Sequence, residues 1–169
     1  MSRDRVIAWF RSALDAVEPR VLTAAALAGG GPGATVIAIG KASRAMALGA
    51  ADALGTVAGV CVSDSSGEVP EGMELLVGDH PIPGPASFRA GRRALEAARA
   101  CEGRCIVLLS GGGSALCEQP LPGVPEEFVS DVTRALLAGG ASIGETNLVR
   151  GHLSAIKAGG LARAAGGTV

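Results

Sequence analysis

Three consecutive glycines stand between two serines directly after the apolar run CIVLL. The run is typical of a strand buried on both faces of a sheet. Glycines lack Cβ atoms, so successive backbone N–H groups can curl around an anion, and the two serines add hydroxyl donors. The segment predicts a phosphate-binding loop, with a simple turn of the chain as the alternative. The five residues of this glycine loop are Ser110, Gly111, Gly112, Gly113 and Ser114.

A lysine and a histidine follow two other apolar runs. Lys41 comes directly after TVIAIG and before a helical pattern, where exposed amides and the helix dipole attract anions. An ammonium there suits a phosphate, and a solvated lysine is the alternative. A Walker loop is excluded because Thr35 and Ala42 occupy positions that require glycine and a hydroxyl residue. His80 lies in GDHPIPGPAS, whose prolines hold the backbone extended, so we expect a substrate contact or else a rigid linker.

These candidates need a fold that gathers the ends of several strands. Short apolar segments alternate with helical patterns, which predicts an α/β domain with a Rossmann-like, doubly wound, mostly parallel sheet and flanking helices. Ligands bind such sheets beyond the carboxyl ends of the strands, so the three loops should share one rim. We expect strands at 35–40, 57–64, 73–79 and 105–111, helices at 2–17, 21–28, 41–55, 87–100, 125–138 and 142–160, and the start of another strand at 166–169.

Local signals refine two of these helices. Ser87 is expected to cap the helix over 87–100, and Ser142 with Glu145 predicts a capping box for the helix that follows. Asp64 and Asp79 come at the ends of two expected strands and are the nearest candidates for metal ligands or for a general base, neither of which the sequence otherwise identifies.

Composition excludes several classes of protein. The chain has 169 residues, a net charge of -1, three Phe, one Trp and no Tyr, so it has neither the basic field nor the aromatic residues for nucleic-acid binding. Its apolar runs are shorter than a membrane span, and the N-terminal segment has helical spacing instead of a signal-peptide core. We expect one cytoplasmic domain. The four cysteines lack zinc-site spacing and are expected to be buried free thiols.

Four motifs occur in the order AIGKAS, GDHPIPGPAS, LLSGGGSAL and LLAGGASIGETNLVRGHLSAIKAGGLA. With them the sequence resembles the glycerate kinase type 2 family, also called the MOFRL family, from Arg5 to the last residue. The resemblance implies ATP-dependent phosphorylation of D-glycerate to 2-phosphoglycerate with Mg²⁺. By similarity, Lys41 matches the active-site lysine, the glycine loop lies beside the site, and Asn147 and Arg150 face the same cleft.

The sequence departs from the family pattern in two places. Gly151 replaces a basic residue after the arginine, which loosens that helix by about 1 kcal/mol. The family pattern also continues past the position of Val169 into a strand, an aspartate-bearing loop and a smaller C-terminal MOFRL domain with the catalytic arginine. Residues 1–169 therefore correspond to an incomplete N-terminal domain. We expect the N-terminal part of a glycerate 2-kinase, with no turnover from this chain alone.

Two other functions stay open. One is a truncated or degenerate module of the same family without catalysis. The other is a hydroxypyruvate reductase, a label that some family members carry, although the chain lacks a dinucleotide fingerprint. The expected ligands are glycerate and ATP. An unpaired sheet edge would favour self-association, or a partner that supplies the missing domain.

Overall fold

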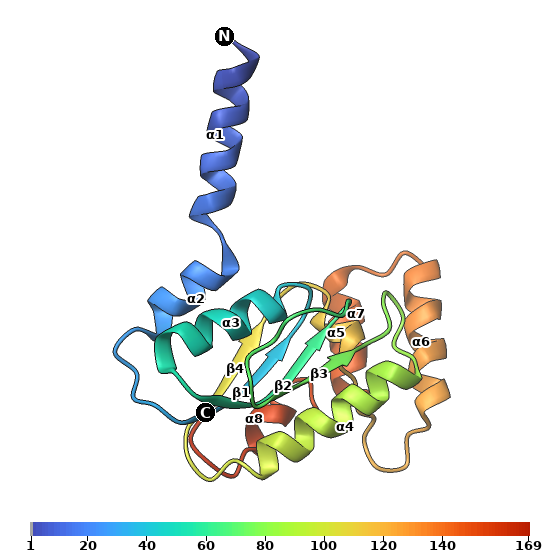
Figure 1. Cartoon of the computed structure of the whole chain (residues 1–169). Coiled ribbons are helices and arrows are strands. Elements are labelled where there is room, and N and C mark those ends of the chain that lie inside the picture. Colours follow the sequence, from blue (N-terminus) through green and yellow to red (C-terminus); the bar gives the residue numbers. More distant parts are fainter. Residues whose placement is uncertain (1) are drawn as a thin grey trace.

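The computed structural model describes residues 2–169 and contains one parallel four-stranded sheet (Figure 1). The strand order is β3-β2-β1-β4, so the chain first moves outward from β1 and then returns to pair β4 on its other side. This order confirms the predicted doubly wound α/β fold and places its topological switch point between β1 and β4. The strands are β1 (Ala34–Ile39), β2 (Val57–Ser63), β3 (Met73–Val77) and β4 (Cys105–Leu109).

Helices cover both faces of this sheet. The second and third helices pack on one face and the fourth and eighth on the other, while the first helix projects away from the body and the sixth and seventh stand side by side at one end (Figure 1). The helices are α1 (Arg3–Ala16), α2 (Pro19–Leu27), α3 (Ser43–Leu54), α4 (Pro85–Arg99), α5 (Gly113–Leu116), α6 (Glu126–Ala138), α7 (Ile143–Leu153) and α8 (Gly160–Ala164). No helix within residues 2–169 combines the length and apolar character that a membrane span requires.

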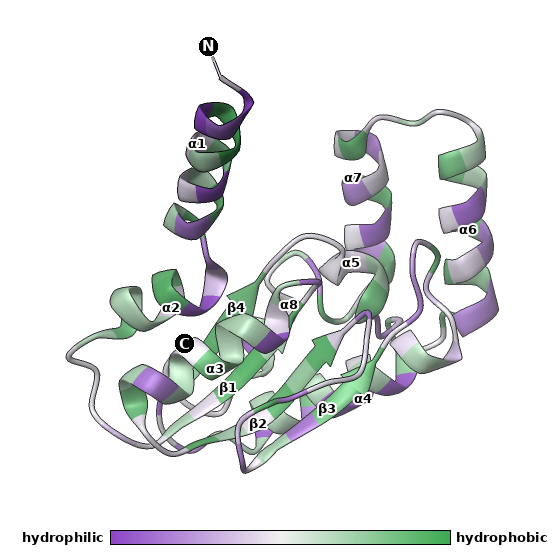
Figure 2. Ribbon diagram, turned by 45° about the horizontal axis from the view of Figure 1, so that its top comes forward, coloured by the Kyte–Doolittle hydropathy of each residue, from purple (hydrophilic) through white to green (hydrophobic). Residues whose placement is uncertain are grey.

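The central strand β1 explains why its sequence is apolar without alternation. Val36 and Ala38 pack in the cluster that includes α3, whereas Ile37 and Ile39 pack in the cluster that includes α4. All four are buried, and Figure 2 shows the hydrophobic character of the inner strands. Successive side chains of a strand point to opposite faces, so burial of both faces requires a continuous apolar run.

The helix predicted over 142–160 ends earlier than expected. Its capping box at Ser142 and Glu145 is confirmed, but α7 stops at Leu153. Ser154 is extended, forms an antiparallel bridge with Pro120, and donates its hydroxyl hydrogen to Glu118. These contacts join residues more than 30 positions apart, so the helical periodicity of the sequence gives no sign of them.

The start of α4 also differs from the prediction. The helix begins at Pro85, and the carboxylate of Asp79 accepts a hydrogen bond from the Ala86 amide at 2.9 Å. Ser87 lies inside the first turn instead of capping it, and its hydroxyl group donates to the Asp79 carbonyl at 3.2 Å. Asp79 therefore holds the loop after β3 against the N-terminus of α4.

The last residues lie beside β4. Thr168 forms a parallel bridge with Arg104, and its carbonyl accepts from the Cys105 amide at 2.8 Å. The expected start of a strand is therefore present as a single bridge. Further along β4, Leu109 keeps 66% of its surface exposed.

All four cysteines are buried free thiols, as predicted. Burial raises the pKa of the Cys117 thiol to about 12, above the value near 8.5 of an exposed thiol. The folded chain therefore keeps a proton that the unfolded chain loses above about pH 8.5. The contribution of Cys117 to the free energy of unfolding is therefore fully present below that pH and is lost as pH rises. We expect Cys117 to lower the free energy of unfolding by about 1 kcal/mol between pH 7.5 and pH 9.5. Urea titrations followed by circular dichroism should show a weaker pH dependence for Cys117→Ala than for the natural chain, and parallel curves would contradict this prediction.

Candidate anion-binding site at the switch point

The loops after β1 and β4 are joined where the strand order reverses. Gly40 has a φ of +122°, and a Cβ added there would lie 2.3 Å from Ser110 Oγ, so a glycine is required for this approach. The Ala42 amide donates to Ser110 Oγ at 3.1 Å, and the Lys41 amide donates to the Gly111 carbonyl at 2.9 Å. The two loops form one continuous rim.

Residues from three predicted loops meet above Gly112. A Cβ added to Gly112 would lie 3.2 Å from Lys41 Cγ, 3.3 Å from Lys41 Cε and 3.5 Å from His80 Cδ2. The aliphatic stem of Lys41 and the imidazole of His80 therefore cover the same glycine. Both side chains are exposed, so their polar ends are accessible to a ligand.

The glycine loop offers free backbone donors at this point. Gly113 donates to the Ser110 carbonyl at 3.4 Å, which closes the turn into α5. In the part of the chain that the structure describes, the amides of Gly111, Gly112 and Ser114 donate to no protein acceptor. Free amides beside an ammonium form a suitable environment for the oxygens of a phosphate or a carboxylate.

Gly112 is expected to resist substitution. Its φ of +84° is unfavourable for residues with a Cβ, and the added atom would crowd Lys41. Gly112→Ala should lower the free energy of unfolding by about 1–2 kcal/mol because of the left-handed backbone. Thermal unfolding measures this, with Gly111→Ala as the matched control because a Cβ at Gly111 meets no atom within 4 Å. Equal losses in the free energy of unfolding for the two variants would contradict the special requirement for glycine at position 112.

The two expected site residues on α7 have different surroundings. Arg150 is buried, with a side chain that is 7% exposed, and its Nη2 donates to the Ser114 carbonyl. Asn147 is exposed, and no hydrogen bond joins it to the glycine loop within residues 2–169. Arg150 therefore contacts the buried side of the glycine loop. Asn147 makes no hydrogen bond to this loop within residues 2–169.

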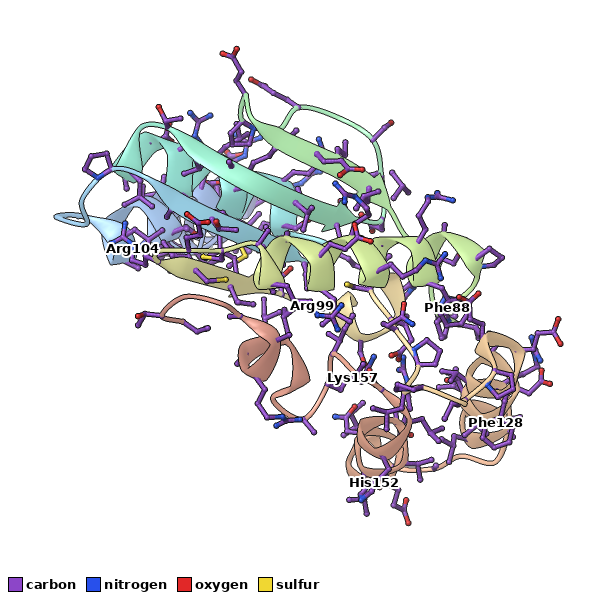
Figure 3. All side chains as sticks on the ribbon, turned by 90° about the horizontal axis from the view of Figure 1, so that it is seen from below. Phe88, Arg99, Arg104, Phe128, His152 and Lys157 are labelled. Atoms are coloured by element: carbon purple, nitrogen blue, oxygen red, sulfur yellow. The ribbon has the colours of Figure 1, made fainter. Side chains whose placement is uncertain are left out.

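A buried carboxylate and a second cation complete the surroundings of Arg150. Glu118 is fully buried, and its Oε2 lies 3.6 Å from Arg150 Nη2 and contacts Lys157 Nζ. Figure 3 shows Lys157 between α7 and α8. Burial lowers the pKa of Lys157 and of Arg150, and Glu118 opposes this change in both. Glu118 and Lys157 were not among the expected site residues, although each is a charge directly after two apolar residues, LC and AI, which was a usable signal.

The two aspartates that the sequence offered as metal ligands lie apart from any ligand cluster. Asp79 holds α4, as described above, and Asp64 is exposed beside Ser63 and Ser65. Among residues 2–169, no three His, Cys, Asp or Glu side chains gather closely enough to hold a metal ion. This portion of the chain does not provide a protein cage for Mg²⁺.

Comparison with known proteins identifies the family. A family model described as "Domain of unknown function (DUF4147)" matches residues 5–168. The chain belongs to the DUF4147 family. This DUF4147 chain is 41% identical over 131 residues to a D-glycerate 2-kinase from Thermotoga maritima, covering 73% of this chain and 31% of that protein. It is 40% identical over 136 residues to a glycerate 2-kinase from Pyrococcus horikoshii, covering 79% and 31%.

Solved structures agree with the sequence comparison. The crystal structure of a glycerate kinase from Thermotoga maritima matches with a TM-score of 0.73 and 36% identity over 90% of this DUF4147 chain and 39% of that chain. An Agrobacterium vitis relative, 41% identical over 135 residues, is named provisionally as a hydroxypyruvate reductase. The expected family resemblance is confirmed. The chain spans about a third of the length of these curated relatives.

Proposed function

We propose that the chain forms the N-terminal part of a glycerate 2-kinase that phosphorylates D-glycerate at its 2-hydroxyl group with ATP. The names of its relatives support the kinase class. The observation that carries the proposal is the position of the Lys41 side chain over Gly112, at the switch point of the sheet, beside amides that have no acceptor within residues 2–169. Phosphoryl transfer depends mainly on positioning and charge neutralisation, and these groups provide both.

The residues of the rim have distinct roles in this proposal. The free amides of the glycine loop bind phosphate oxygens, and the Lys41 ammonium neutralises charge that develops during transfer. Ser110 braces the loop against the Ala42 amide. His80, whose imidazole covers Gly112, contacts the substrate from the loop after β3. Asn147 is exposed on α7 without a hydrogen bond to the rim within residues 2–169, and the proposal gives it no role.

ATP supplies the phosphoryl group when it is bound. Mg²⁺ is part of the proposed reaction, but the described residues do not form a ligand cluster for it. The proposal therefore assigns no metal ligand to this chain.

A chimaera provides the test of this function. Residues of this chain would replace the matching third of the Thermotoga maritima enzyme, and product would be measured by phosphorus NMR, which separates 2-phosphoglycerate from 3-phosphoglycerate. We expect ADP and 2-phosphoglycerate to form only when ATP and D-glycerate are both present. Circular dichroism and a cooperative thermal unfolding transition would establish that the chimaera is folded, independently of whether it binds ATP.

The other functions give different results in the same experiment. If the chimaera oxidises NADH in the presence of hydroxypyruvate and does not use ATP, the protein is a reductase and the kinase proposal is wrong. A folded chimaera that binds no ATP and forms no product would identify a non-catalytic module and would contradict the proposal.

A further inference from the structure

The buried cluster of Glu118, Arg150 and Lys157 lies directly beneath the glycine loop. Glu118 Oε1 accepts from the Ser154 hydroxyl group and from the Gln119 amide, and Oε2 faces both cations. The Glu118 amide donates to the Ser87 carbonyl at 3.1 Å, which ties the same residue to α4. Glu118 therefore connects the segment after the glycine loop with α4, α7 and the segment that follows α7.

The two cations of this cluster make different contacts. Each approaches Glu118 Oε2, but Arg150 also donates to the Ser114 carbonyl, whereas Lys157 has no hydrogen bond to the glycine loop within residues 2–169. One guanidinium nitrogen makes both contacts of Arg150, because Nη2 donates to the Ser114 carbonyl and forms the 3.6 Å ion pair with Glu118 Oε2. Of the two cations, Arg150 alone links the buried carboxylate to the loop within residues 2–169.

The loop needs such a link because its own structure is weak. The helix α5 has only four residues and follows Gly112 in a left-handed conformation. Its single turn rests on three bonds, from the Ala115 and Leu116 amides to the Gly112 carbonyl and from the Cys117 amide to the Gly113 carbonyl. A single helical turn after several glycines is not stable by itself, because nucleation is unfavourable and glycine loses much conformational freedom on folding.

We propose that Arg150 is a positioning residue that fixes the glycine loop through the Ser114 carbonyl, and that Glu118 anchors Arg150 for this role. The identity of the bound anion as ATP rests on the proposed function, but the positioning of the loop does not. Arg150 binds the buried side of the loop through the Ser114 carbonyl. The free amides of the loop stay accessible to the ligand.

Two matched variants of the 169-residue chain test this proposal. Arg150→Met and Lys157→Met each leave Glu118 with one cation, so both clusters are electrically neutral. Amide hydrogen exchange measured by NMR reports the opening of the loop at Ala115, Leu116 and Cys117. We expect Arg150→Met to accelerate exchange at these amides about 10-fold relative to amides of β1, and Lys157→Met to change it less than about 2-fold. Equal acceleration in the two variants would overturn the proposal.

A second pair of measurements separates positioning from general destabilisation. Arg150→Lys keeps a cation beside Glu118, but its nitrogen lies one bond closer to the backbone than Arg150 Nη2 and loses the hydrogen bond to the Ser114 carbonyl. The same local acceleration is therefore expected even if Arg150→Met does not fold. Normal exchange at the loop in a folded Arg150→Lys variant would count against the role of Arg150. Calorimetric titration with ATP should show about 10-fold weaker binding for the Arg150 variants and unchanged binding for Lys157→Met.

The failure of this inference can be distinguished from failure of the proposed function. If the natural chain does not bind ATP, the assignment of the nucleotide to this rim is wrong, while hydrogen exchange still decides whether Arg150 holds the loop. If ATP binds and the Arg150 and Lys157 variants bind it equally well, the positioning role is wrong and the rim remains the binding site.

Discussion

Replacing Lys41 by alanine is expected to reduce turnover of the glycerate kinase chimaera by about 10²–10³-fold, the usual loss when a group that stabilises developing charge is removed. Lys41 is exposed and forms no salt bridge within residues 2–169, so the substitution should leave the fold intact. The same variant of the isolated chain should bind ATP about 10-fold more weakly, because a charged hydrogen bond is lost. Steady-state kinetics and calorimetry provide the two measurements.

Arg44 supplies a matched control for this experiment. It lies in the first turn of α3, close to Lys41 in sequence, but its guanidinium lies against Gly67, where an added Cβ would be 1.7 Å from Nη1. Arg44→Ala removes the same charge without removing a group from the rim. We expect its turnover and ATP affinity to stay within about 2-fold of the natural values. Comparable losses of turnover and ATP affinity for the two variants would mean that Lys41 contributes only to the net charge of the protein and makes no specific contact.

Replacing Glu118 by glutamine is expected to lower the free energy of unfolding by about 3–5 kcal/mol, because it leaves two buried cations without a counter-charge. The loss should decrease as pH rises. Burial already lowers the pKa of Lys157, and removal of Glu118 lowers it further, so the unfolded chain binds more protons than the folded variant below the ordinary lysine pKa. Stability of the variant relative to the natural chain therefore increases from neutral pH towards about pH 10.

Urea denaturation followed by circular dichroism at pH 7.5 and at pH 9.5 measures this effect. The control is the triple variant Glu118→Leu, Arg150→Met and Lys157→Met, in which apolar side chains replace all three charges. Such replacements in other proteins often restore stability, so we expect the triple variant to be more stable than Glu118→Gln alone. A loss for Glu118→Gln that is small and independent of pH would show that the cluster is hydrated.

The fold was largely predictable because its strands carry a simple signal. The uninterrupted apolar residues of β1 follow directly from burial on both faces, and the alternation of strands with helices is enough to predict the parallel sheet. Element ends were less predictable. The end of α7 at Leu153 depends on a contact of Ser154 with Glu118, and the start of α4 depends on Asp79, which lies outside the helix.

The candidate site was predictable to the extent that it depends on loop position. Parallel strands bring their carboxyl ends together, so Lys41, His80 and Gly112 were expected on one rim, where the structure places them. The support beneath the rim was not predictable in the same way. Glu118 contacts Arg150 and Lys157, which follow it by more than 30 residues, and no local periodicity relates the three positions.

Because α1 projects from the body of the protein, tryptophan fluorescence reports the surroundings of this helix and not those of the sheet. Trp9, the single tryptophan of the chain, is 56% exposed on this helix, with the Arg5 guanidinium 5.3 Å from its ring centre. Its fluorescence emission therefore reflects water and a neighbouring cation, and denaturing the sheet should change it little. A shift of the emission to shorter wavelength would instead show that another surface has covered α1, which makes this residue a built-in probe of association.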